Sequence, residues 1–233
     1  MRFNQAVIKI FLLLLIAGLL YLTFLWQDSY LLISFGLVIL SILFFIIRFE
    51  SRRVEPRELV LLSVLAAIAA VSRVPFASIP GVQPTTFVIM MSGFVFGAES
   101  GFIIGAVAAL ASNMMLGQGP WTPWQMVAWG LVGLTAGVLR KTKLMNRVWG
   151  RILFGVIWGF LFGWIMNLWG IIALTQSASP INLKVIFLYF AGSALFDTFH
   201  SASNVIFLLV FGHVSIKILT RFKRKYGLLN LDA

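Results

Sequence analysis

The sequence contains no cysteine and few charged residues. Without cysteine, neither a disulfide framework nor a thiolate metal site can form. Charged residues make up 11% of the 233 residues, whereas soluble globular chains contain about 25%. Hydrophobic residues make up 61%, and the mean hydropathy is +1.00. A chain with so little charge cannot cover a water-facing surface, so the composition predicts an all-α fold, a polytopic membrane helix bundle.

Signatures of the common enzyme classes are also missing from the sequence. It has no His-Glu-x-x-His, no Gly-x-Ser-x-Gly, no paired-acid motif and no Walker loop. Asp197 is the one acidic residue deep within a predicted membrane segment, with His200 three residues further on. A single Asp–His pair without a recognisable nucleophile does not define an active site. We therefore expect no enzyme, no cofactor and no metal, and an intramembrane enzyme is the least supported alternative.

Eight apolar segments are predicted to form helices. They are Val7–Trp26, Ser29–Ile47, Leu59–Arg73, Thr85–Ala98, Gly101–Leu116, Trp124–Leu139, Ile152–Thr175 and Leu183–Leu219. The first is long enough to span a hydrocarbon core, and a second follows without a convincing cleavage site. We therefore expect a retained transmembrane hairpin over residues 1–47. A cytoplasmic linker (48–58), a six-helix core (59–219) and a basic cytoplasmic tail (220–233) complete the predicted organisation.

The net charge of +11 is distributed in a way that predicts orientation. Basic residues gather in short blocks between apolar runs, which is typical of membrane orientation signals and not of a nucleic-acid surface. If both termini lie in the cytoplasm and eight segments alternate, 16 of the 18 basic residues fall inside. Only Arg73 and Lys184 fall outside. We expect a multi-pass protein of the cell membrane with both termini cytoplasmic and no nucleic-acid partner.

Small residues recur at four-residue spacing in several predicted helices. The sets are Ala66 and Ala70; Gly93, Gly97, Gly101 and Gly105; and Gly155, Gly159 and Gly163. Lipid provides no hydrophobic drive between helices, so close contact relies on such residues. Each set indicates either packing within one bundle or a face that docks another membrane subunit, and the spacing alone does not decide between them.

Polar side chains within predicted membrane segments are costly and are therefore candidate functional residues. The last segment carries Ser193, Asp197, His200, Ser201 and Asn204 on one helical stripe. Residues near the predicted outer side are Arg73, Phe76, Gln83, Asn113, Gln118, Trp121, Trp124, Gln125 and Asn167. The stripe is either a structural network or the wall of a cavity, and Trp121 and Trp124 are alternatively interface anchors. An aromatic and amide-rich lip above a polar stripe favours a solute pocket.

Two stretches are specific enough to indicate a family. They are Gln83-Pro84-Thr85-Thr86-Phe87-Val88 and residues 113–126, which include Gly-Gln-Gly-Pro-Trp-Thr-Pro-Trp-Gln. Six predicted helices, the Ala66 and Ala70 pair and a proline-bearing loop over 74–84 accompany them. From about Glu58 onward, the chain resembles the substrate-binding S component of energy-coupling factor (ECF) vitamin transporters. The hairpin over 1–47 departs from the usual six-helix core.

The resemblance implies a mode of action. An S component captures a vitamin from outside in a pocket beneath its outer loops, here formed by the residues of the lip and the polar stripe. It docks on a scaffold transmembrane subunit through small-residue faces such as Ala66 and Ala70, and two cytoplasmic ATPase subunits drive the cycle. Among such proteins the chain looks most like those assigned to cobalamin or its corrinoid precursors. A stand-alone secondary transporter or channel for a small organic solute is the alternative.

Overall fold

The computed structural model describes residues 36, 39–40, 56–175 and 183–226, and every structural statement below concerns these residues. Most of the predicted hairpin over 1–47, the linker up to residue 55 and the tail from residue 227 lie outside them. The elements in order are α3 (Pro56–Arg73), the 3-10 helix η2 (Val74–Phe76), α4 (Pro84–Phe96), α5 (Ala98–Leu116), α6 (Thr122–Leu139), α7 (Val148–Thr175) and α8 (Leu183–Tyr226). All regular elements of the described ranges are helices, so the predicted all-α fold class is confirmed.

The helix ends differ from the predicted ones in two informative places. The turn between α4 and α5 lies at Gly97, whose φ of 100° is a left-handed conformation that favours glycine. The predicted segments Thr85–Ala98 and Gly101–Leu116 leave the turn at residues 99–100, but Glu99 lies in the first turn of α5. At its far end α8 continues to Tyr226 instead of Leu219, because the lysines and arginines there are good helix formers.

The surface of the bundle is suited to a membrane. Four described helices are long and apolar enough to cross one, over Pro56–Phe76, Ala98–Leu116, Val148–Ile171 and Leu183–Tyr226. Large apolar side chains such as Val60 and Ile68 on α3 and Leu195 and Ile206 on α8 are exposed. Because lipid tails cover such residues at no cost, the chain is a multi-pass membrane protein, as the composition predicted.

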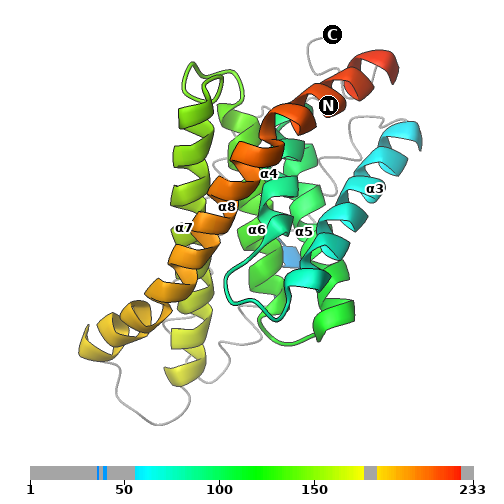
Figure 1. Cartoon of the computed structure of the whole chain (residues 1–233). Coiled ribbons are helices and arrows are strands. Elements are labelled where there is room, and N and C mark those ends of the chain that lie inside the picture. The colour runs from blue at the N-terminus through cyan, green and yellow to red at the C-terminus, as the bar shows by residue number, and fades with distance from the viewer. Residues whose placement is uncertain (1–35, 37–38, 41–55, 176–182, 227–233) are drawn as a thin grey trace, which may run out of the picture.

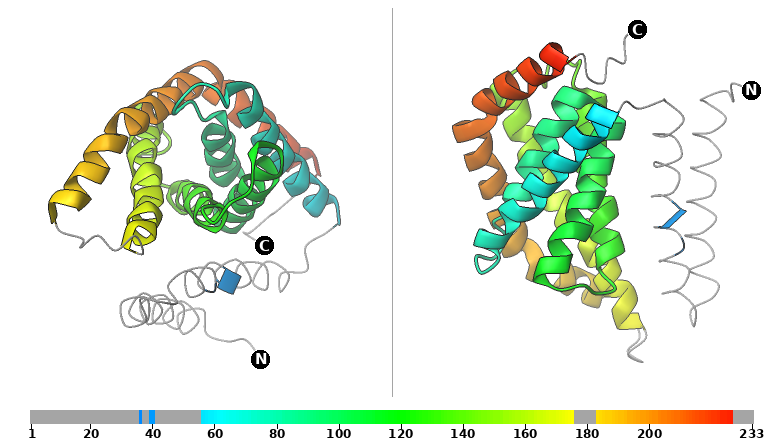
Figure 2. Two further views of the ribbon diagram at one scale, coloured as in Figure 1. Left: turned by 90° about the horizontal axis from the view of Figure 1, so that it is seen from below. Right: turned by 90° about the vertical axis from the view of Figure 1, so that its right-hand side faces the viewer.

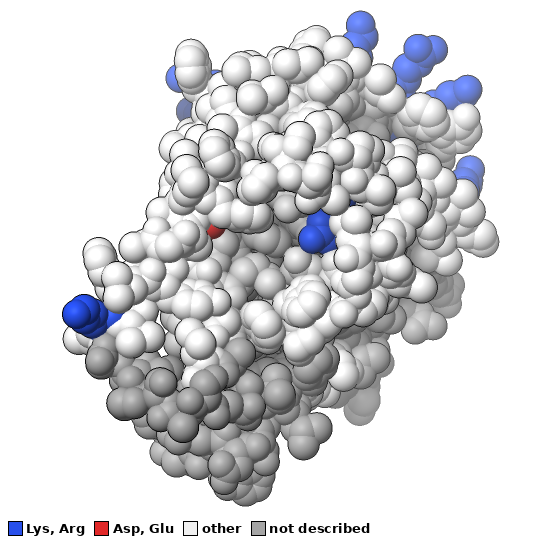
Figure 3. All heavy atoms as spheres, turned by 60° about the horizontal axis from the view of Figure 1, so that its bottom comes forward, with Lys and Arg blue, Asp and Glu red and all other residues white. Residues whose placement is uncertain are grey.

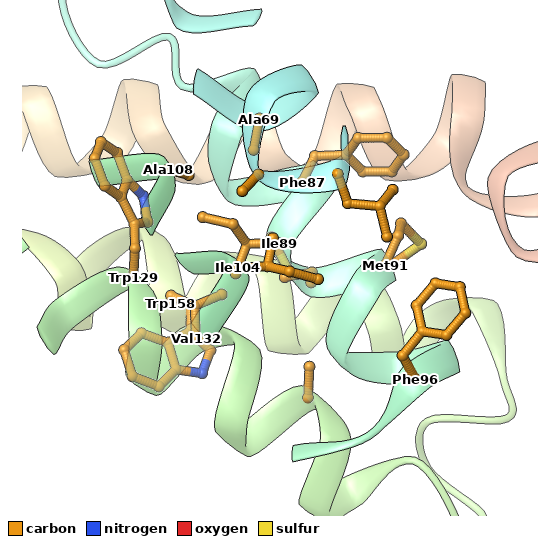
Figure 4. Packing of buried hydrophobic residues seen from close by; sticks show 14 of the residues in the cluster. Ala69, Phe87, Ile89, Met91, Phe96, Ile104, Ala108, Trp129, Val132 and Trp158 are labelled. Carbon is orange, nitrogen blue, oxygen red and sulfur yellow. The ribbon is translucent and has the colours of Figure 1, made fainter. Parts of the chain in front are cut away.

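α4, α5 and α6 form the centre of the bundle, with α3 and α7 on opposite sides of it (Figure 1). α8 runs antiparallel to α7, packs along it, and crosses one face of the bundle obliquely to reach α4 (Figure 2). α7 contacts α6 only lightly, so the α7–α8 pair is joined to the centre mainly through α4. Figure 4 shows the buried core between these helices, where Ile89, Ile104 and Val132 interdigitate.

The glycine sets are used within the bundle. A Cβ atom added to Gly101 would collide with the backbone of Gly133, and one added to Gly105 would collide with the backbone of Trp129. α5 and α6 therefore approach until backbone meets backbone, a contact that any larger residue would prevent. The glycines of α7 make room for α8 in the same way, since Gly159 faces Ser201.

The alanine pair of α3 also points inward. Ala66 and Ala70 are each 2% exposed, and Ala66 belongs to the hydrophobic core. The outward face of α3 carries Val60, Val64 and Ile68 instead. In this conformation the pair is covered by its own bundle, so docking through it stays a prediction that requires α3 to move.

Candidate functional site

The two ends of the bundle differ in charge. We call them the Arg73 end, where α3, α5 and α7 finish, and the basic end, which carries residues 140–151 and the last turns of α8. Figure 3 shows the face toward the Arg73 end hollowed, with one basic and one acidic group on its walls. Several basic side chains lie along the far rim of that view. A recess with a few charged groups on its walls thus opens at the end with less basic charge (Figure 3).

Arg73 is held on one side of this end by uncharged partners. Its Nη1 donates to Ser112 Oγ at 3.0 Å and to Asn113 Oδ1 at 2.7 Å, which ties α3 to α5. Asn113 is buried, and its Nδ2 donates to Thr122 Oγ1 at 2.9 Å and to Gln125 Oε1 at 2.6 Å on α6. Ser112 and Asn113 carry no charge, so these two hydrogen bonds do not neutralise the guanidinium of Arg73. Its positive charge remains available to a ligand.

The loop between α5 and α6 is built around Thr122. The Thr122 hydroxyl donates to Gln118 Oε1 at 2.8 Å and accepts from the Gly119 amide at 3.3 Å. Gln118 Nε2 donates in turn to the Leu110 carbonyl at 3.2 Å. Gly117 has a φ of 111°, which explains a glycine at that turn. The Gly-Gln-Gly-Pro-Trp-Thr run therefore specifies one loop conformation.

Two tryptophans, one in this loop and one just after it, lie at the border of the recess. Trp121 is half-buried, and its ring meets Trp169 of α7 edge-on, with ring centroids 6.1 Å apart and an interplanar angle of 73°. Trp124 is half-buried on the first turn of α6. The Trp121–Trp169 contact bridges the centre of the bundle and α7 where those two are otherwise in light contact.

A buried aromatic row connects Arg73 to α8. The Arg73 guanidinium lies 5.0 Å from the centroid of the Trp129 ring, within cation–π range. Phe162 of α7 lies 4.9 Å from Trp129 and 5.2 Å from His200, measured between ring centroids. Trp129 Nε1 donates to Thr86 Oγ1 at 2.9 Å, and the same hydroxyl is hydrogen-bonded to His200 Nε2 at 2.8 Å. α4, α6, α7 and α8 thus meet at one point.

Asp197 of α8 lies on the wall of the recess opposite Arg73 (Figure 3). It is 1% exposed, and its Oδ2 accepts a hydrogen bond from Ser193 Oγ at 3.1 Å. Asn167 of α7 donates to the same Ser193 oxygen at 2.6 Å. Asp197 Oδ1 has no hydrogen-bond partner among the described residues, and Gly163 is the residue that leaves it room. A buried carboxylate oxygen without a donor is costly, which favours a ligand donor at this position.

The remaining predicted residues serve other contacts. Asn204 Nδ2 donates to the Gly155 carbonyl at 2.9 Å, so this end of the polar stripe joins α8 to α7. The backbone N–H of Gln83 donates to Ser203 Oγ at 3.1 Å, which attaches the loop between α3 and α4 to α8. Phe76 packs edge-on against Phe207, at 6.0 Å between centroids, beside a separate apolar groove of about 390 Å³.

The structure therefore groups some predicted residues and separates others. One hydrogen-bond network contains Arg73, Asn113, Gln118 and Gln125. His200 is connected to Arg73 by the ring contacts of the aromatic row. Asn167 and Asp197 form a second network, while Phe76 lies apart. Sequence reasoning missed Thr86, Trp129 and Phe162. Thr86 lies in one of the two specific stretches, but nothing in the sequence distinguishes Trp129 and Phe162 from ordinary core aromatics.

The fold and the recess together define a polytopic helical membrane protein with paired polar networks at one end of its bundle. The model of the family described as the ECF transporter, substrate-specific component, matches residues 57–220. This match covers more than half of the chain, so the protein belongs to that family, whose members are transporter subunits. No curated protein and no solved structure matches the chain.

Proposed function

We propose that this protein captures a vitamin at the Arg73 end, with cobalamin or a corrinoid precursor as the candidate solute. Family membership supports the role of a substrate-capture subunit. The observation that carries the location of the site is the buried Trp129–Phe162–His200 row, with Arg73 at one end and Asp197 beside the other. An apolar recess with a few convergent polar groups is the usual form of a small-molecule site.

The chemistry of the two walls fits an amphipathic ligand that both accepts and donates hydrogen bonds. Arg73 offers N–H donors and a positive charge to a carbonyl, carboxylate or phosphate of the ligand. Asp197 Oδ1 offers an acceptor to an amide or hydroxyl group. Corrinoids carry a broad ring edged by amide groups, which present both donors and acceptors. Trp121 at the border adds an aromatic surface on which such a ring can stack.

The Arg73 end is assigned to the outside of the cell in this proposal. Together with Arg57 at the start of α3, the basic end holds eleven of the thirteen described lysines and arginines, and such residues accumulate on the cytoplasmic side. The recess then faces the medium from which the vitamin is captured. Release into the cytoplasm would occur only in a complex with a scaffold transmembrane subunit and two cytoplasmic ATPase subunits.

The docking surface for the scaffold subunit is assigned to α3. Ala66 and Ala70 were predicted for this role, and they become available only if α3 separates from the bundle, since both are buried. On the outward face Ser63 and Ala67 are exposed small residues at the same four-residue spacing. A partner helix can approach this outward stripe without any rearrangement of the bundle.

Isothermal titration of the detergent-solubilised protein with cyanocobalamin and with cobinamide tests the proposal. We expect binding to the natural sequence and at least tenfold weaker binding to Arg73→Gln and Asp197→Asn, since a hydrogen bond to a charged group contributes about 1.5–3 kcal/mol. Arg140→Gln, a half-buried arginine at the basic end, is the matched control and should bind normally. Normal affinity in both site variants, with the fold intact, would place the pocket elsewhere. Failure of both corrinoids to bind the natural protein would overturn the choice of solute.

A further inference from the structure

α8 extends well beyond the part of the bundle that a membrane can cover. It has 44 residues, which correspond to about 66 Å at about 1.5 Å per residue, or about twice the thickness of a hydrocarbon core. The helix also runs obliquely across the bundle (Figure 1). Its last turns at the basic end therefore lie at the membrane surface, where headgroups and water meet the hydrocarbon.

These last turns have two exposed faces of different chemistry. One face lines a shallow concavity with His213, Ile216, Lys217, Thr220, Arg221, Arg224 and Lys225. Their spacing of three and four residues places four cationic side chains on one side of the helix. The neighbouring face exposes Val214, Ile218 and Phe222. A helix with a basic face beside an apolar one is the form that lies in a membrane interface.

The basic face is held in a fixed orientation. Lys223 points the other way and donates from Nζ to the Val95 carbonyl near the end of α4, at 3.1 Å. Leu219 packs against the hydrophobic core, and so does Ile216 at the edge of the basic face. The segment is thus attached to the bundle on its inner side. In the described ranges only Glu58 and Glu99 bring carboxylates to this end, and both belong to the first turns of other helices.

We propose that this face is a binding site for an anionic phospholipid of the cytoplasmic leaflet. The phosphate is bound by the guanidinium groups of Arg221 and Arg224, which suit phosphate geometry, with Lys217 and Lys225 adding charge. The acyl chains follow the exposed apolar face into the bilayer. This site is distinct from the proposed solute pocket, which lies at the opposite end, and it anchors the long helix to one leaflet.

Native mass spectrometry of the full-length protein in neutral detergent tests this site. The probes are phosphatidylglycerol, phosphatidylcholine with the same acyl chains, and inorganic phosphate as a competitor. We expect retention of phosphatidylglycerol over phosphatidylcholine, with no displacement by phosphate. A basic residue near a membrane surface contributes about fivefold to binding, so Arg221→Gln/Arg224→Gln should weaken retention about 25-fold. Lys143→Gln/Arg147→Gln removes the same charge from exposed residues of the same end and should retain the lipid.

Each alternative outcome overturns the assignment in a recognisable way. Equal loss in both double variants would mean that general surface charge, and not this face, attracts the lipid. Equal retention of the two lipids, or displacement by phosphate, would exclude an anionic lipid as the specific ligand. Unchanged lipid retention in Arg221→Gln/Arg224→Gln, together with loss of the scaffold subunit on copurification, would make this face a protein-docking surface.

Discussion

Asn113→Leu is the substitution that most directly probes the network beneath Arg73. Asn113 is 1% exposed and forms three side-chain hydrogen bonds, which join α3, α5 and α6. Leucine has a similar size but no polar atoms, so the change removes all three bonds and leaves Gln125 and Thr122 short of a donor. Side-chain hydrogen bonds in membrane bundles average about 0.6 kcal/mol each, which sets a lower limit of about 2 kcal/mol. The bond to the charged Arg73 contributes more, so we expect a loss of about 2–4 kcal/mol.

Unfolding of the detergent-solubilised protein in increasing denaturant measures this loss. Asn146→Leu is the matched control, because Asn146 is exposed in the connection before α7, and its replacement should change stability by less than about 0.5 kcal/mol. The proposed binding of a corrinoid should also weaken in Asn113→Leu, since Arg73 loses a contact that orients its guanidinium. A change in Asn113→Leu no larger than in Asn146→Leu would show that the three bonds are not formed together.

Three further substitutions test other parts of the account. Gly163→Ala should lower both the stability of the fold and the affinity for the proposed vitamin, because the new Cβ would occupy the position of the Asp197 carboxylate. Gly192→Ala is the control, since a Cβ at Gly192 has open space and should leave thermal unfolding unchanged. Ala66→Trp should destabilise the bundle by about 1–3 kcal/mol or more through overpacking, because Ala66 is buried. Ala67→Trp, on the exposed face of α3, should fold but lose uptake in a reconstituted transporter. Normal uptake by Ala67→Trp would exclude the exposed face of α3 as the docking surface. Trp121→Ala should weaken vitamin binding by about 0.5–1.5 kcal/mol or more if the ring stacks on the ligand, and unchanged affinity by titration would make Trp121 an interface anchor.

The helices of the core could be predicted because each is an apolar run bounded by charge, proline or glycine. The boundaries were less accurate where local chemistry was ambiguous. Glu99 and Ser100 are the polar residues between two predicted segments, but the turn lies at Gly97, where the backbone adopts a positive φ that favours glycine. The basic residues after Leu219 suggested a tail, although lysine and arginine also sustain a helix, and α8 continues to Tyr226.

The candidate site was predictable only where residue type carries a signal in a membrane. Arg73, Asn113 and Asp197 attract attention because polar groups in apolar segments are costly. Trp129 and Phe162 join the two walls, but an aromatic residue within a helix is normal core, and its neighbours depend on how each helix is rotated. The same limit explains Ala66, since a four-residue spacing of small residues describes inward and outward faces equally well.

The central claim is that this chain captures a vitamin at the Arg73 end and hands it on only with partner subunits. Mass spectrometry of small molecules that copurify with the natural protein and with Arg73→Gln tests it most directly. The account predicts that a corrinoid copurifies with the natural protein, is depleted in the variant, and is not taken up by liposomes that contain the chain alone. Equal amounts of the corrinoid in both preparations would contradict the assigned site, and uptake by the chain alone would contradict its dependence on partner subunits.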